Sequence, residues 1–190
     1  MRIGILGGTF DPPHVGHLIA AQDACSTLAL DRLIFVPAAE PPHKQGRTIT
    51  DARLRLEMLR AAVCDNPQFE VSTIELDRPG PSYTVTTLRE LRDRHPGDSL
   101  HLLIGFDQVR EFDTWRKPAE ILEISSVVML TRAGADQPDR PADFVRRIVP
   151  VTRIDISSTL IRSRVAAGES IRYLVPDAVS EIIEREGLYR

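Results

Sequence analysis

Two histidines three residues apart, His14 and His17, close the stretch GGTFDPPHVGH, which begins at Gly7. An apolar run, Ile3–Leu6, comes directly before it. An apolar run that ends in glycines predicts a buried strand entering a tight turn, where the backbone can approach a ligand. The two prolines then favour the start of a helix, and residues three apart on a helix share one face. Backbone N–H groups, a helix N-terminus and two imidazoles would meet there, which predicts an anion site with phosphate as the expected anion.

A second stretch suited to phosphate, Asp155–Arg162, reads DISSTLIR and follows a short apolar segment. Ser157 or Ser158 would cap the helix that begins here, because a hydroxyl oxygen can accept a bond from a first-turn N–H. Many serines at such positions do nothing more. The same N–H groups and hydroxyls also suit phosphate oxygens, and Arg162 lies one turn further on, where it could face them. The stretch therefore predicts a second set of phosphate contacts.

Other phosphate and metal signatures are missing. The sequence contains neither G-x-x-x-x-G-K-[ST] nor G-x-G-x-x-G, which excludes the Walker-type phosphate loop and the dinucleotide fingerprint of dehydrogenases. His14 and His17 have the spacing of metal ligands on a helix, but no third ligand of matching geometry is evident, so no protein metal site is expected. Cys25 and Cys64 lie far apart with no CxxC, and we expect buried free thiols in a reducing compartment.

The elements that must position these residues alternate between strand and helix along most of the chain. Apolar strand patterns fall at Arg2–Gly7, Leu33–Pro37, Glu70–Ile74, Leu100–Gly105 and Val127–Thr131. Helical patterns fall at about His14–Leu30, Asp51–Cys64, Thr84–His95 and Lys117–Ile124, with a closing amphipathic helix at Pro176–Arg190. Short apolar strands alternating with helices predict an α/β fold, a doubly wound, Rossmann-like parallel sheet with helices on both faces. Its ligand crevice would lie at the carboxyl ends of the strands.

Length and composition suit a modest enzyme with a single domain spanning residues 1–190. The chain is 42% hydrophobic and 27% charged, and its formal net charge of -3 argues against a nucleic-acid binder, which would carry a basic face. No apolar stretch approaches the length of a membrane span, and the N-terminal strand is too short for a signal peptide, so we expect a cytoplasmic protein. The closing helix would suit either the sheet or a second copy of the chain, which leaves a homo-oligomer open.

The histidine stretch resembles the HxGH signature of the nucleotidyltransferase superfamily, and ISSTLIR resembles its ISSTxIR signature. Within that superfamily the chain resembles the bacterial nicotinate-mononucleotide adenylyltransferases over essentially all 190 residues. The further matching residues are Val36-Pro37, Pro41–Lys44, Pro81–Thr84, Thr87-Leu88, Gly105–Asp107 and Trp115. The resemblance implies transfer of the adenylyl group of ATP to nicotinate mononucleotide, with Mg²⁺ carried by ATP, and it implies neither a nucleic-acid partner nor a membrane partner.

The resemblance also implies roles for individual residues. His17, His14 and Lys44 would be catalytic. The residues expected to bind ATP are Gly8, Thr9, Phe10, His14, His17, Gly105, Asp107, Ile156, Ser157, Ser158, Thr159 and Arg162. The residues expected to bind the acceptor are Tyr83, Thr84, Trp115, Lys44 and Arg132.

Four of the five acceptor residues also have a plainer interpretation. Trp115 could be a core residue, Lys44 a solvated loop lysine, Tyr83 a packing residue and Arg132 half of a surface ion pair. The chain departs from the family pattern at two positions. Thr86 stands where the family has Asp at a helix start, and the bulky Phe106 could reshape the crevice wall.

Two other functions would use the same phosphate motifs. One is adenylyl transfer to 4′-phosphopantetheine by a related enzyme of the superfamily. The other is nucleotide binding without turnover, although such a sensor would be expected to have lost a histidine or the Ser-Ser-Thr start, and this chain keeps both.

Overall fold

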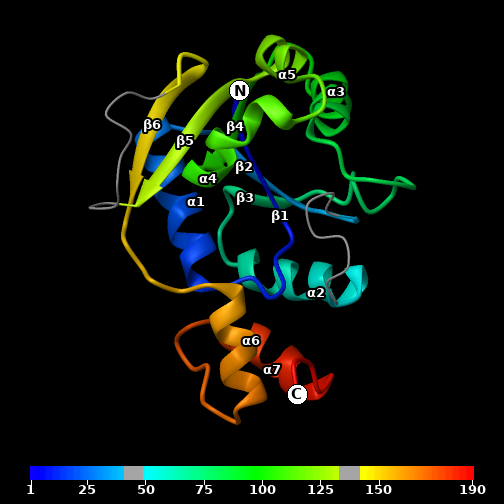
Figure 1. The fold of residues 1–190 in the computed structure, drawn as a ribbon, viewed down its shortest axis with the longest axis vertical. Coiled ribbons are helices and arrows are strands. Elements are labelled where there is room, and N and C mark those ends of the chain that lie inside the picture. Colours follow the sequence, from blue (N-terminus) through cyan, green and yellow to red (C-terminus); the bar gives the residue numbers. More distant parts are fainter. Residues whose placement is uncertain (41–48, 133–141) are drawn as a thin grey trace.

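The computed structural model describes residues 1–40, 49–132 and 142–190, and within these ranges it contains one six-stranded sheet (Figure 1). Every strand pairs parallel to its neighbours, in the order β3-β2-β1-β4-β5-β6. The strands are β1 (Arg2–Gly8), β2 (Arg32–Pro37), β3 (Phe69–Val71), β4 (Ser99–Gly105), β5 (Ser126–Arg132) and β6 (Val145–Val151). The order reverses direction between β1 and β4, and a doubly wound sheet binds its ligands at that point. The predicted fold is confirmed.

Helices connect the strands from β1 to β5 and cover both faces of the sheet, and two more follow β6 (Figure 1). They are α1 (Val15–Leu28), α2 (Ala52–Val63), α3 (Thr84–Arg94), α4 (Phe106–Arg110), the 3-10 turn η2 (Phe112–Thr114), α5 (Pro118–Ile124), α6 (Ser158–Ala166) and α7 (Asp177–Arg185). Alternate residues of each strand point to opposite faces, so each face builds its own core. One core packs the strands against α3, η2 and α5, and the other packs them against α1 and α2.

A third apolar cluster lies away from the sheet. It joins α6 and α7 to α2 through Met58, Ile161 and Ile182, among other residues. In Figure 1 these two helices and the C-terminus lie below the sheet, next to the end of α2. Because α6 carries the predicted serine motif, this cluster sets where that motif meets the sheet.

Two predicted boundaries were wrong by more than two residues, and one is that of the closing helix, which was predicted at Pro176–Arg190 but ends at Arg185. The third strand, predicted at Glu70–Ile74, ends at Val71, and Ile74 is buried from the turn that follows. Strand β6 was not predicted beyond a short apolar stretch, because it holds two exposed arginines and Pro150, a pattern typical of an edge strand.

The two cysteines differ from each other. Cys25 is buried in α1, as predicted, and burial raises the pKa of its thiol to about 11. Cys64 was also predicted to be buried, but it is exposed, because it lies at the end of α2 where the chain turns into solvent. Neither thiol belongs to a group of three or more potential metal ligands among the described residues.

Candidate active site

A cavity of about 620 Å³ lies at the carboxyl edge of the sheet and brings the two phosphate motifs together. Its lining includes His14, His17, Gly105 and Asp107 from the β1 and β4 ends. The predicted residues from the other motif also line it, namely Ile156, Ser157, Ser158, Thr159 and Arg162. Motifs separated by about 140 residues therefore form one cavity with several hydrogen-bond donors, as a polyphosphate would require.

The two histidines stack on each other at the start of α1. Their ring centroids are 3.7 Å apart, and His14 is buried whereas His17 is half-buried. His14 is the N-cap of α1, and its backbone N–H donates to Nδ1 of His17 at 3.2 Å. Because Nδ1 accepts this bond, the neutral His17 ring carries its proton on Nε2, which is then the ring atom that can donate to an anion. The helix start thus fixes both the ring and its tautomer.

Two glycines make room for these rings. A Cβ on Gly16 would lie 3.0 Å from Nδ1 of His14, and a Cβ on Gly8 would lie 2.9 Å from the ring of Phe10. Phe10 itself has a φ of 50°, which is uncommon for a residue with a side chain, and its buried ring meets His17 edge to face. The glycines therefore allow the close packing that sets the histidine geometry.

Replacing Gly16 by alanine is expected to separate activity from stability. Alanine favours a helix interior over glycine by roughly 0.5–1 kcal/mol, but Gly16 is the second residue of α1 and its new Cβ would press on the buried His14 ring, so the two effects oppose each other and the Tm should change little. The added Cβ would push the His14 ring, and we expect kcat to fall by about tenfold, because a small displacement at a reacting centre is costly. Paired thermal-melt and steady-state measurements check both effects, and a Gly16→Ala enzyme with unchanged kcat would contradict this role for the glycine.

Ser158 and Arg162 tie α6 to the turn that follows β1. The Ser158 hydroxyl donates to the Pro12 carbonyl at 2.9 Å, and Nη1 of Arg162 donates to the Asp11 carbonyl at 2.7 Å. Ser157 is the N-cap of α6, and its hydroxyl accepts from the Leu160 N–H at 3.1 Å. The Ser158 proton is thus committed to the Pro12 carbonyl, whereas the Ser157 hydroxyl accepts a bond and keeps its own proton to donate to a phosphate oxygen, beside the first-turn N–H groups and the Arg162 guanidinium.

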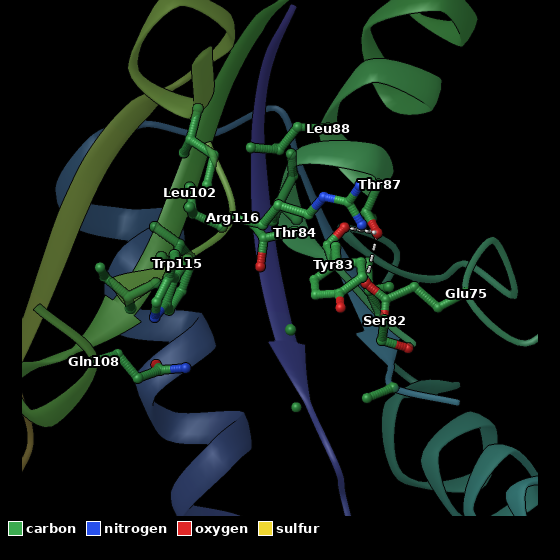
Figure 2. Close-up of a pocket in the computed structure, with 18 of the residues that line it drawn as sticks. Glu75, Ser82, Tyr83, Thr84, Thr87, Leu88, Leu102, Gln108, Trp115 and Arg116 are labelled. Atoms are coloured by element: carbon green, nitrogen blue, oxygen red, sulfur yellow. Dashed lines mark hydrogen bonds between the residues drawn. The ribbon is translucent and has the colours of Figure 1, made fainter. Parts of the chain in front are cut away.

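A second cavity, of about 400 Å³, adjoins the first at Thr9, which lines both. Figure 2 shows its two walls, one formed by the start of α3 and the other by the segment around Trp115. Tyr83 is the N-cap of α3 and Thr84 its first residue, as predicted. The Thr86 N–H already donates to the Tyr83 carbonyl at 3.0 Å, which leaves the N–H groups of Thr84 and Val85 to make this wall suited to an anionic group. Trp115 is half-buried and packs against Phe112 at a centroid distance of 5.4 Å.

Arg116 and Glu75 line this second cavity but were not predicted. The Arg116 guanidinium lies over the Tyr83 ring, 4.6 Å from its centroid, and so joins the two walls. The Glu75 carboxylate is buried and accepts a hydrogen bond from the Thr87 hydroxyl at 2.6 Å, which holds the turn before α3 against that helix (Figure 2). Arg116 could have been predicted as a cavity residue because it follows Trp115 directly in the sequence. A glutamate in a mostly polar turn gave no such signal.

Of the remaining predicted residues, two have side chains that the structure does not describe. Lys44 lies outside the described residues, and the structure describes the backbone of Arg132 but not its side chain. Phe106 lines neither cavity but packs against the core on the α3 face, which supplies Ile104 and Ile121 to the smaller cavity, so its effect on the crevice wall stays a prediction. Thr86 leaves the first turn of α3 without an acidic residue, as predicted.

Over residues 1–40, 49–132 and 142–190, no three histidine, cysteine or acidic side chains gather as they would around a metal ion. No helix in the same ranges is long and apolar enough to cross a membrane.

Residues 5–164 match the Cytidylyltransferase-like family, and this range covers most of the chain. The chain belongs to that family. Among its cytidylyltransferase-like relatives, a Thermus thermophilus protein named "Probable nicotinate-nucleotide adenylyltransferase" is 48% identical over the full length of both chains. A Roseiflexus protein of the same name is 47% identical, covering 99% of this chain and 98% of its own.

Solved structures also show the cytidylyltransferase-like fold. The Plasmodium falciparum nicotinic acid mononucleotide adenylyltransferase, complexed with NaAD, superposes with a TM-score of 0.82 at 16% identity. The match covers 99% of this chain and 97% of that one. The same Plasmodium enzyme complexed with APC gives a TM-score of 0.79 at 17% identity. At these identities the likeness is one of fold.

Proposed function

We propose that this protein transfers the adenylyl group of ATP to nicotinate mononucleotide, releasing pyrophosphate and forming the dinucleotide, as a cytoplasmic enzyme of NAD biosynthesis. In this proposal the 190 residues form one nucleotidyltransferase domain. The observation that carries it is the pair of adjoining cavities, one rich in donors for phosphate and one mostly apolar with an aromatic wall, which meet at Thr9. The full-length relatives named nicotinate-nucleotide adenylyltransferase, up to 48% identical, support the choice of acceptor.

ATP would occupy the larger cavity. His17, together with His14, would donate to oxygens of the α- and β-phosphates, and the N-terminus of α1 would favour the same negative charge. The first turn of α6 and Arg162 would hold the outer phosphates. Asp107, at the first turn of α4, would accept hydrogen bonds from ribose hydroxyls. Lys44, which lies outside the described residues, would add a further positive charge to the polyphosphate.

The acceptor would occupy the smaller cavity. Its pyridine ring would stack on Trp115, and its carboxylate would face the N–H groups at the start of α3. Arg116 supplies a positive charge at the same wall, which favours the carboxylate of nicotinate mononucleotide over the neutral amide of nicotinamide mononucleotide. Because Arg116 is exposed, solvent screens this charge and the preference it gives is modest.

The reaction would be an in-line attack by the acceptor's 5′-phosphate oxygen on the α-phosphorus of ATP. The acceptor phosphate is already ionised, so no side chain must act as a nucleophile or base. Catalysis then rests on holding the two phosphates in line and on neutralising the charge that builds on the α-phosphate. In this proposal the adjoining cavities would hold the two phosphates in line, and His14 and His17 would donate to the α-phosphate oxygens.

A divalent metal, for which we propose Mg²⁺, would arrive with ATP. The donors of the larger cavity are mostly imidazole, guanidinium and N–H groups, and the Asp11 carboxylate is held by Tyr189 and Thr50. This donor set fits a metal carried by the triphosphate rather than a dedicated protein site, because Mg²⁺ takes oxygen ligands. When bound, the metal would neutralise phosphate charge.

The test of the proposal is pyrophosphate release from ATP with three acceptors offered separately: nicotinate mononucleotide, nicotinamide mononucleotide and 4′-phosphopantetheine. We expect the highest kcat/KM with nicotinate mononucleotide. A clear preference for phosphopantetheine would refute the acceptor, and no release with any of the three would mean that the site binds nucleotide without transfer.

Replacing Trp115 by alanine in the same assay is expected to raise the KM for nicotinate mononucleotide by roughly 10- to 100-fold and to leave the KM for ATP almost unchanged. The size follows from the loss of about 1–3 kcal/mol of base–aromatic stacking. Trp115→Phe keeps an aromatic face and should recover most of the affinity. If Trp115→Ala binds the acceptor as well as the parent enzyme does, the tryptophan is only a packing residue.

A further inference from the structure

Tyr189, the next-to-last residue, contacts the turn that follows the first strand. Its hydroxyl donates to Oδ1 of Asp11 at 2.6 Å, across 178 positions of sequence. Asp11 is only 5% exposed and lies three residues before His14, inside the histidine motif. The C-terminal end of the chain is therefore hydrogen-bonded directly to the turn that carries the phosphate-facing histidines.

Asp11 joins several parts of the phosphate cavity. Its other carboxylate oxygen accepts from the Thr50 N–H at 3.2 Å, and its backbone carbonyl accepts from Nη1 of Arg162 at 2.7 Å. The buried Arg55 guanidinium holds both neighbouring carbonyls, donating to Thr9 at 2.8 Å and to Thr50 at 2.9 Å. The Asp11 carbonyl is thus one anchor of the Arg162 guanidinium, which also donates to the Thr159 hydroxyl at 3.3 Å.

The approach of Tyr189 to Asp11 is built into the C-terminal packing. Tyr189 has a φ of 66°, a backbone conformation that side-chain-bearing residues seldom adopt, and it packs against the apolar cluster formed by α2, α6 and α7. Burial raises the pKa of the Tyr189 phenol well above its ordinary value, and the bond to Asp11 raises it further. The hydroxyl therefore stays protonated and remains a donor.

We propose that Tyr189 is a positioning residue for the ATP phosphates, acting through Asp11 on Arg162. An effect of Tyr189 on turnover rests on the proposed function. An effect of Tyr189 on ATP affinity requires only that ATP occupies the larger cavity. Tyr189 lines neither cavity, so it would act without touching the nucleotide. Because Asp11 and Arg162 do not line the smaller cavity, the acceptor side should not respond.

The test compares Tyr189→Phe, which removes only the hydroxyl, with two control variants. Tyr173→Phe removes the same group from a tyrosine that is 78% exposed. Leu188→Ala disturbs the same apolar cluster without removing a hydrogen bond to Asp11. For each protein we would measure the Kd of a non-hydrolysable ATP analogue by calorimetry, the KM of each substrate, and the thermal melt.

We expect Tyr189→Phe to raise the Kd of the ATP analogue roughly tenfold, because a hydrogen bond to a buried carboxylate is lost. The KM for nicotinate mononucleotide should stay unchanged. Tyr173→Phe should match the parent protein. Leu188→Ala should melt earlier but bind the analogue normally at temperatures where it is folded.

Two results would overturn the inference. One is a Tyr189→Phe variant that binds the analogue as tightly as the parent protein. The other is a Leu188→Ala variant that loses as much affinity for the analogue as Tyr189→Phe does, which would mean that the tyrosine only stabilises the fold. A different result would refute the proposed function. If the parent protein binds the analogue but releases no pyrophosphate with any acceptor, that function is refuted, while weaker binding in Tyr189→Phe would still uphold the positioning role.

Discussion

Replacing His17 by alanine is expected to lower kcat by about 10²–10³-fold and to change the KM for ATP much less. The imidazole would donate to a phosphate oxygen most strongly as charge builds in the transition state, so its loss should fall on turnover rather than on binding. The His14 N–H bond to Nδ1 of His17 keeps the neutral ring in the donating tautomer. The measurement is steady-state pyrophosphate release with both substrates varied.

The matched control is His95→Ala. His95 lines neither cavity and lies 3.7 Å from the Asp98 carboxylate at the far end of α3, so its loss should leave kcat within about twofold of the parent value. A thermal melt of both variants would show that each is folded. Turnover near the parent value in His17→Ala would refute the role given to this histidine.

Replacing Arg55 by methionine is expected to lower the free energy of unfolding by about 3–5 kcal/mol. The Arg55 side chain is 1% exposed and donates to the carbonyls of Thr9, Thr50 and Ala39. Burial lowers the pKa of the Arg55 guanidinium, while the charges of Asp11 and Asp51 oppose that shift. Methionine fills similar space but leaves buried carbonyls unpaired and the Asp11 carboxylate without a neighbouring positive charge.

Arg53 offers a control on the same helix. It is exposed, so Arg53→Met should change the free energy of unfolding by no more than about 0.5 kcal/mol. Denaturant titrations of the two variants and the parent protein, fitted with a shared slope, provide the comparison. Equal midpoints for Arg55→Met and the parent would mean that the buried guanidinium contributes nothing net to stability.

The sequence predicted the parts of the fold that repeat a local pattern. Strands β1, β2, β4 and β5 are continuous apolar runs bounded by polar or glycine residues, which a buried parallel strand requires. Strand β6 was missed because an edge strand has one neighbour and tolerates arginine and proline. Helix α4 was missed because its five residues make less than two turns, too few for apolar positions to repeat at helical spacing.

For the site, too, the residues within one local motif could be predicted and the contacts between distant residues could not. His14 and His17 lie within one short motif, so their shared position could be predicted from spacing. The network around Asp11 could not, because it joins residues 9, 50, 55 and 162 with Tyr189, and no local pattern connects them. Arg55 is also a charged residue on an amphipathic helix, where the usual expectation is exposure to solvent.

The most direct measurement follows a label. ATP radiolabelled at its α-phosphorus would be incubated with the protein and nicotinate mononucleotide, and the products separated. Attack on the α-phosphorus predicts that the label passes into the dinucleotide in step with the release of unlabelled pyrophosphate. Label that stays in ATP, or that appears only in AMP, would contradict adenylyl transfer by this site.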